Sequence, residues 1–303
     1  MKFNKPFVLL FVSILAVSIS SIMIKASTTP PAVAGMYRLF ITVLIMIPFV
    51  PWKMVRSLQM GRKDWSIVFI AGVFLGLHFL FWMESLLHTS VASSMVILTL
   101  QPLFVMIGSY FLFKERVTML TTLCMIAAVA GSMIIAWGDI GISRAALIGD
   151  GLSLLGTVSM SVYMLAGQKV SHKIPANLYS VIVFFIGGSV LLIYSLVNQF
   201  SLTDYRPADW TYFVLLAIIP TIFGHYLFNL LLKSIGATTV SVGIIGEPVL
   251  AIILAYLLLG ESISASQLLG GMLTIAGIAL YFWPRSRDAK ELAKTEKGVL
   301  DVH

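Results

Sequence analysis

The sequence predicts an all-α polytopic membrane protein with ten transmembrane helices, arranged as two inverted five-helix repeats. Three observations support this fold class: the composition, the number of long apolar stretches, and an internal repeat. Hydrophobic residues make up 59% of the 303 residues and charged residues only 11%, whereas soluble domains carry about 25% charged residues. Such a chain cannot cover its surface with polar side chains, so the solvent around it must be lipid.

Ten stretches are apolar and long enough to cross a bilayer. A helix through hydrocarbon about 30 Å thick needs about 20 mostly apolar residues, because its backbone must satisfy its own hydrogen bonds. The predicted spans are Phe7 to Ile24, Val33 to Trp52, Trp65 to Met83, Val91 to Phe113, Met119 to Trp137, Leu147 to Gly167, Leu178 to Asn198, Trp210 to Leu232, Val240 to Leu259, and Ser266 to Pro284. Only short loops remain, so any binding site must lie within the bundle.

The first apolar stretch also resembles a secretory signal peptide, because it follows Lys2 and Lys5. A retained helix is the favoured interpretation. The apolar run is longer than the usual core of a signal peptide, and Lys25 with Pro30 and Pro31 makes a poor small-residue cleavage site.

The basic residues predict the orientation, since short cytoplasmic loops retain Lys and Arg. With the amino terminus inside, sixteen of the 20 basic residues fall in inside segments, and only Lys25, Arg144 and Arg206 fall outside. Both termini are therefore expected in the cytoplasm, with a polar tail over residues 285–303. The same asymmetry accounts for the net charge of +7. No basic run is interleaved with stacking aromatic residues, so nucleic acid is not an expected partner.

An internal repeat divides the chain. A shift of 146 residues superimposes 102–137 on 248–283 with nine identities in 36 columns. The matched pairs include Pro102 with Pro248, Tyr110 with Tyr256, and Glu115 with Glu261, and a shift of 145 pairs Asp64 with Asp209. Residues 1–140 and 141–284 are therefore predicted to be two five-helix repeats.

Five is an odd number, so the second repeat enters the membrane from the opposite side to the first. Inverted repeats are typical of secondary transporters, in which the substrate binds near the midplane between the halves. Some channels and purely structural bundles share this organisation, and they remain alternatives.

Three segments resemble the EamA family of the drug/metabolite transporter superfamily. They are Gly246-Glu247-Pro248-Val249-Leu250-Ala251 with its continuation to Glu261, the counterpart from Gln101-Pro102-Leu103 to Glu115, and Arg38-Leu39-Phe40. The resemblance covers residues 5 to 284. It implies a ten-helix carrier of small metabolites, often an exporter of amino acids or related compounds, with helices one, three, four, six, eight and nine around the pathway. Gln101 stands where the second repeat has Glu247, so only one repeat can carry a proton at this position.

Glu247 is the acidic residue nearest the middle of a span. A carboxylate there costs about 2.5–3.5 kcal/mol, so it persists only when paired, hydrated or protonated. Pro248 and Pro102 cannot donate a backbone hydrogen bond and predict helix hinges. Glu247, with its counterpart Gln101, is a candidate partner for a substrate amine or a coupling proton. A structural hydrogen bond between helices is the alternative.

Arg38 lies inside the second span, nearer its outer end. Its long side chain allows the guanidinium to reach the interface, and the alternative is a pair with a carboxylate or a substrate anion. Glu115 and Glu261 lie at the ends of the fourth and ninth spans, where they are expected to brace neighbouring helices.

His78 and His225 lie at depth on the third and eighth helices. Histidine titrates near neutrality, so the pair offers a proton relay, although each is also an ordinary packing residue. Asn229, one turn after His225, extends the polar face of the eighth helix. Aromatic candidates for the walls around an organic solute are Trp82, Tyr163 and Tyr226.

These features predict a secondary transporter that exports a small metabolite, such as an amino acid or a related amphipathic compound, by alternating access. Coupling to protons and uncoupled exchange both remain open, as does the oligomeric state. An intramembrane enzyme or lipid-handling protein that uses the histidines is the alternative. No glycine-rich phosphate loop or hydrolase motif is found, and Cys124 is the only cysteine. No cofactor, metal or catalytic residue is therefore expected. The family resemblance implies the bacterial inner membrane.

Overall fold

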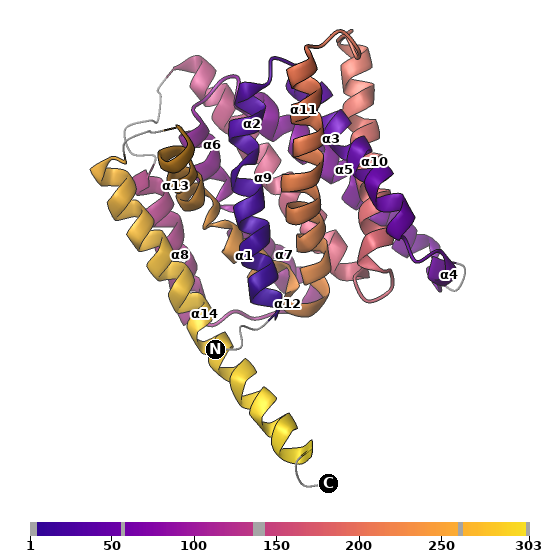
Figure 1. Ribbon diagram of the computed structural model, residues 1–303. Coiled ribbons are helices and arrows are strands. Elements are labelled where there is room, and N and C mark those ends of the chain that lie inside the picture. The colour runs from indigo at the N-terminus through magenta and orange to yellow at the C-terminus, as the bar shows by residue number, and fades with distance from the viewer. Residues whose placement is uncertain (1–4, 56–57, 136–142, 260–262, 301–303) are drawn as a thin grey trace.

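The computed structural model describes residues 5–55, 58–135, 143–259 and 263–300, and the chain within these ranges is helical (Figure 1). The elements are α1 (Lys5–Ser18), α2 (Ser20–Ala26), α3 (Pro31–Met46), the 3-10 turn η1 (Ile47–Phe49), α4 (Trp52–Val55), α5 (Arg62–Ser85), α6 (Val91–Leu98), α7 (Gln101–Phe113), α8 (Met119–Ile135), α9 (Arg144–Val170), α10 (Ala176–Val197), α11 (Pro207–Leu216), the π-helical segment η2 (Ala217–Tyr226), α12 (Leu227–Ile244), α13 (Glu247–Leu259) and α14 (Ala265–Leu300).

The predicted membrane fold is confirmed. Eight helices in the described ranges are long and apolar enough to cross a membrane, and Met119–Ile135 is a shorter apolar helix. The longest of the eight, Pro207–Ile244, contains the predicted eighth span and the first residues of the ninth. Gly236 separates the two, because its positive φ of 74° breaks the helix and lets the chain turn back.

The fourth and ninth spans are each broken at mid-membrane rather than continuous. The fourth consists of α6 and α7, which meet between Leu98 and Gln101, and the ninth is broken between Ile244 and Glu247. Proline follows the first residue of each second half-helix, where its missing N–H group has no intrahelical partner to lose. The helix breaks therefore lie directly before Gln101-Pro102 and Glu247-Pro248, next to the two predicted hinge prolines.

Small hydroxyl side chains on α9 support the broken fourth span. Ser153 donates to the carbonyl oxygen of Ser94 at 2.9 Å, and Ser161 lies 3.5 Å from the carbonyl oxygen of Gln101. Thr157 donates to the carbonyl oxygen of Ile97 at 3.3 Å. These contacts hold α9 against the backbone on both sides of the break in the fourth span.

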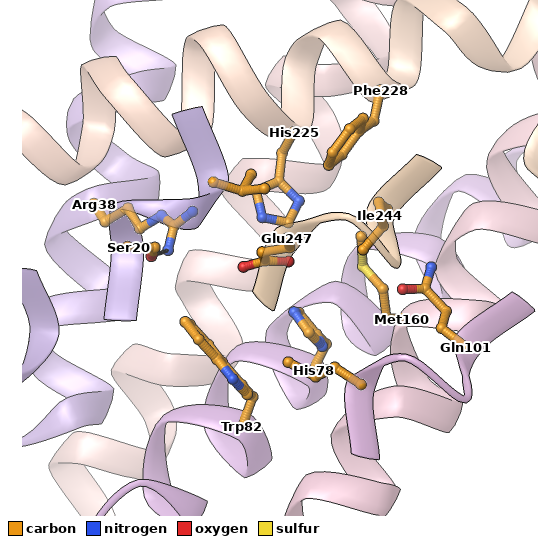
Figure 2. Close-up of a pocket in the computed structure, with 12 residues that line it drawn as sticks. Ser20, Arg38, His78, Trp82, Gln101, Met160, His225, Phe228, Ile244 and Glu247 are labelled. Atoms are coloured by element: carbon orange, nitrogen blue, oxygen red, sulfur yellow. Dashed lines mark hydrogen bonds between the residues drawn. The ribbon is translucent and has the colours of Figure 1, made fainter. Parts of the chain in front are cut away.

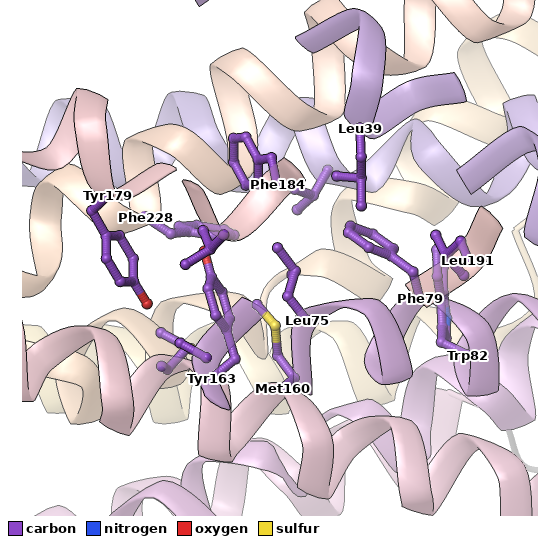
Figure 3. Close-up of a cluster of buried hydrophobic side chains, with 14 of the residues drawn as sticks. Leu39, Leu75, Phe79, Trp82, Met160, Tyr163, Tyr179, Phe184, Leu191 and Phe228 are labelled. Carbon is purple, nitrogen blue, oxygen red and sulfur yellow. The ribbon is translucent and has the colours of Figure 1, made fainter. Parts of the chain in front are cut away.

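The two repeats interlock. The third helix of the first repeat, α5, packs along the first helix of the second, α9, and η2 with α12 packs along α1 in the reciprocal arrangement. Helices α3 and α10, the second of each repeat, also pack together. The aromatic and aliphatic side chains between these helices form one buried cluster that includes Leu75, Phe79, Phe184 and Leu191 (Figure 3).

Two polar contacts show the same symmetry. Lys173 pairs with Asp64 in the first turn of α5, with Nζ 2.7 Å from Oδ1. Thr28 donates to Asp209 in the first turn of α11, with Oγ1 3.0 Å from Oδ2. A shift of 145 residues relates Asp64 to Asp209 and also Thr28 to Lys173. Each repeat therefore fastens its third helix to the loop after the first helix of the other repeat.

Helices α8 and α14 pack against each other at one edge of the bundle (Figure 1). Glycines allow the close approach: a Cβ atom at Gly131 would lie 2.5 Å from the backbone nitrogen of Thr274. Helix α14 continues past this edge to Leu300, and it ends on the same side of the bundle as α1 begins (Figure 1).

We predict that Gly131→Ala lowers the melting temperature of the detergent-solubilised protein, because the added methyl group meets backbone atoms that cannot rotate away. The expected loss is about 1–3 kcal/mol of folding free energy. Gly151→Ala is the matched control, since a Cβ atom there has nothing within 4 Å. Equal melting temperatures for the two variants would contradict the packing described for α8 and α14.

Candidate functional site

A central cavity lies where the two broken spans meet the first helices of both repeats (Figure 2). Its lining residues are Val17, Ser20, Arg38, His78, Trp82, Leu98, Gln101, Met160, His225, Phe228, Ile244 and Glu247. They come from the first four spans and from the sixth, eighth and ninth. The free space is about 40 Å³, enough for a few water molecules. A metabolite therefore requires the surrounding helices to separate.

Arg38 is fully buried and points into the bundle, so the interpretation that it reaches the membrane interface is wrong. Its Nε donates to Thr221 at 2.6 Å and its Nη1 donates to Ser20 at 3.1 Å. The guanidinium carbon lies 4.3 Å from the centre of the Phe79 ring, in a cation–π contact. The hydroxyl groups of Thr221 and Ser20 accept hydrogen bonds that water would accept if the guanidinium lay at the membrane interface.

Glu247 and Gln101 begin the second half-helices, α13 and α7, and both are buried in the cavity wall. Helix amino termini carry a partial positive charge, which favours a carboxylate or a carbonyl oxygen at these positions. Within the described ranges, the Glu247 carboxylate makes no hydrogen bond and no ion pair with Arg38. Figure 2 shows Arg38 and Gln101 on opposite sides of the cavity with Glu247 between them.

The two histidines lie next to each other beside Glu247, with ring centres 6.3 Å apart. Nδ1 of His78 is 3.0 Å from the carbonyl oxygen of Gly156. Since a carbonyl only accepts, Nδ1 is the donor and Nε2 of the neutral ring is left as an acceptor. Trp82 stacks parallel to His78 with ring centres 6.1 Å apart.

Three buried polar nitrogens in this wall have no hydrogen-bond partner among the described residues: Nη2 of Arg38, Nε1 of Trp82 and Nδ1 of His225. A buried polar group without a partner costs about 1–3 kcal/mol. Two of the three are obligatory donors, so the cavity offers hydrogen bonds to an acceptor such as a carboxylate. Glu247 supplies the opposite charge across the same space.

Three residues predicted for the site lie outside the central cavity. Tyr163 donates its hydroxyl to Oδ1 of Asn229, whose Nδ2 donates to Ser180 at 2.9 Å. Tyr226 donates to Asn177 at 3.2 Å. These contacts join the sixth, seventh and eighth spans beside the cavity.

Sequence reasoning missed Ser20 and Thr221, the two hydroxyl partners of Arg38. Ser20 follows the short break between α1 and α2, and Thr221 follows Pro220 in the π-helical segment. Pro220 is the sequence feature that could have pointed to this region, because a proline inside a long helix disturbs its hydrogen bonding. The segment around it is π-helical, and π-helical turns are frequent at functional sites.

Glu115 braces its neighbours as predicted, accepting from Gln168 at 2.9 Å and from Thr238 at 3.4 Å. Glu261 lies outside the described residues. Among the described residues, no group of three or more potential ligands could hold a metal ion.

Comparison with known proteins found matches that cover nearly all of the predicted membrane spans. The profile of the EamA-like transporter family matches residues 4–137 and 147–283. An uncharacterized transporter of Synechocystis sp. is 24% identical, with the alignment covering 86% of this chain and 76% of that protein. An uncharacterized transporter of Clostridium kluyveri is 25% identical over 80% of this chain and 81% of that protein.

One solved crystal structure superposes with a TM-score of 0.79. It is 19% identical in sequence and the match covers 93% of this chain and 98% of that chain. At this identity the likeness supports the fold alone.

We predict that Thr221→Val destabilises the protein by about 1–3 kcal/mol, because the Nε donor of Arg38 loses its acceptor in a buried position. Thermal unfolding in detergent measures the change. Thr211→Val in α11 is the control, since that side chain is exposed and its hydroxyl lies 3.5 Å from the nearest acceptor. Unfolding of both variants at the same temperature would show that the hydroxyl does not hold the guanidinium.

Proposed function

The chain belongs to the EamA-like transporter family, and from this premise we propose that it exports a small zwitterionic metabolite, such as an amino acid, by alternating access. In this proposal the protein resides in the bacterial inner membrane with both termini in the cytoplasm. Family membership also makes the chain a transporter rather than an intramembrane enzyme, the alternative that the histidines suggested.

The proposal is supported by one observation: the central cavity contains both hydrogen-bond donors without partners among the described residues, on Arg38 and Trp82, and the carboxylate of Glu247. Nη2 of Arg38 and Nε1 of Trp82, which have no partner in the described part of the chain, suit the carboxylate of the solute. The Glu247 carboxylate, which makes no ion pair with Arg38, suits an ammonium group. Charge-assisted hydrogen bonds of this kind are among the strongest that a binding site makes, and a zwitterion satisfies both ends at once.

The interlocked repeats support alternating access. Because the first, third and fourth helices of each repeat line the cavity, rocking one repeat against the other would expose the cavity to one face or the other. The breaks before Gln101 and Glu247 supply the flexible points. With only about 40 Å³ free, the described conformation leaves no room for the solute, so binding requires the helices around the cavity to move.

Glu247 is the proposed coupling residue. Its counterpart Gln101 cannot titrate, so of these two equivalent positions only Glu247 can carry a proton through the cycle. A carboxyl group that alternately faces the two aqueous phases and binds the ammonium group of the solute makes proton and solute compete for one site. The solute then leaves as the proton enters.

We predict that Glu247→Gln removes the response of transport to a pH gradient. Proteoliposomes loaded with a panel of radiolabelled amino acids provide the measurement, with efflux followed at equal and unequal pH. The wild-type rate is expected to change severalfold with the gradient. Glu115→Gln, which alters a carboxyl group at the water boundary, should retain the wild-type response. The same pH dependence in Glu247→Gln as in the wild type would exclude coupling through this residue.

We also predict that Trp82→Phe raises the solute concentration for half-maximal transport about ten- to hundredfold. The change keeps the aromatic ring beside His78 and removes one donor to the solute carboxylate, and a hydrogen bond to a charged group is worth about 1.5–3 kcal/mol. Phe81→Leu on the same helix is the control, because Phe81 lines no part of the cavity. An unchanged half-maximal concentration in Trp82→Phe would show that the indole nitrogen does not contact the solute.

A further inference from the structure

A second cavity lies at the end of the bundle where α9 ends and α10 begins. It has about 320 Å³ of free space, within the range of small-molecule sites and far larger than the central cavity. We call it the vestibule and define it by Ser171, His172, Lys173, Tyr179, Asn229 and Lys233.

The vestibule combines positive charge with apolar walls. Lys173 and Lys233 line it together with His172, and none of the described lining residues is acidic. The Lys173 ammonium is already paired with Asp64, whereas Lys233 makes no ion pair in the described part of the chain. Leu58 and Leu230 contribute apolar surface. The chemistry suits an anion that carries an apolar group.

Tyr179 gives the vestibule a polar group without a partner. The residue is 3% exposed, and its hydroxyl makes no hydrogen bond with any residue that the structure describes. Gly167, which also lines the vestibule, leaves room for this hydroxyl, because a Cβ atom there would lie 2.7 Å from the oxygen. Figure 3 shows Tyr179 at the edge of the buried cluster, beside Tyr163. A bound acceptor would complete the hydrogen bonding of this hydroxyl.

The vestibule and the central cavity are neighbours along α12. Phe228 lines the central cavity, and the next residue, Asn229, lines the vestibule. The Tyr163 hydroxyl is bonded to Asn229 in the same turn of the helix. The two cavities therefore share one turn of α12.

We propose that the vestibule is a second solute site, which holds the carboxylate of an incoming solute between the Tyr179 hydroxyl and the Lys233 ammonium. The apolar part of the solute rests on Leu58 and Leu230. The inference rests on the proposed function, because the vestibule is the place that a cytoplasmic solute occupies before it reaches Arg38 and Glu247.

The test uses the full chain labelled with 3-fluorotyrosine in phosphatidylcholine nanodiscs, followed by fluorine NMR. The Tyr179 signal is assigned by its loss in Tyr179→Phe. Titration with benzoate should move this signal saturably, while benzamide and benzylammonium should bind at least tenfold more weakly. Lys233→Gln, at an exposed position, should weaken benzoate binding about fivefold. Lys53→Gln, a basic residue of α4 outside the vestibule, should leave it unchanged.

Three results would overturn the proposal. One is an equal response to benzoate and benzylammonium, and another is the same affinity in Lys233→Gln and Lys53→Gln. The third is that phosphatidylglycerol in the nanodisc reproduces the shift and blocks benzoate, which would identify the vestibule as a lipid headgroup site. If Tyr179→Phe does not fold, the Lys233→Gln and Lys53→Gln affinities decide the matter through whichever tyrosine signal responds to benzoate.

Arg38→Gln separates this proposal from the proposed function. It should abolish amino-acid efflux and leave the benzoate response intact. Loss of the benzoate response in Arg38→Gln would assign that response to the central cavity and contradict the vestibule site. A normal benzoate response in a wild-type protein without efflux would support the vestibule and contradict the export function alone.

Discussion

The fully buried guanidinium of Arg38 is the constraint on which the central site depends. A charge at this depth in lipid is tolerated only with partners inside the protein, and no carboxylate pairs with it among the described residues. The guanidinium instead contacts the hydroxyl groups of Thr221 and Ser20 and the ring of Phe79. The second span is thereby tied to the π-helical segment of the eighth, so the cavity wall and the arginine position depend on each other.

The inverted repeat gives this site its asymmetry. Gln101 and Glu247 start equivalent half-helices after equivalent breaks, so their backbones have nearly the same environment. Only one carries an ionisable group. The two repeats therefore share the helix break but differ in the side chain that follows it. A carrier whose two conformations are related by symmetry can then bind a cation or a proton at one of the two positions.

Much of the fold could be predicted from the sequence, because a bilayer permits only internally bonded backbone and each span must be long and apolar. The repeat and the two proline positions anticipated the helix breaks. Six of the predicted site residues line one cavity: Arg38, His78, Trp82, Gln101, His225 and Glu247. Depth along a helix does not determine which face a side chain occupies, however. For that reason the sequence alone places Arg38 near the interface, and it cannot distinguish Tyr163, Asn229 and Tyr226, which lie outside the central cavity, from the residues that line it. The roles of Thr221, Ser20 and Tyr179 depend on contacts between distant spans, which no local pattern reveals.

In the proposed cycle, the cavity around Arg38 opens to each side of the membrane in turn. Labelling of Ser20→Cys, in a Cys124→Ala background and in sealed proteoliposomes, by a membrane-impermeant thiol reagent applied from either face measures this opening. We expect labelling from both faces, slowed on both by a transported amino acid. Labelling from one face alone, or from neither, would contradict it.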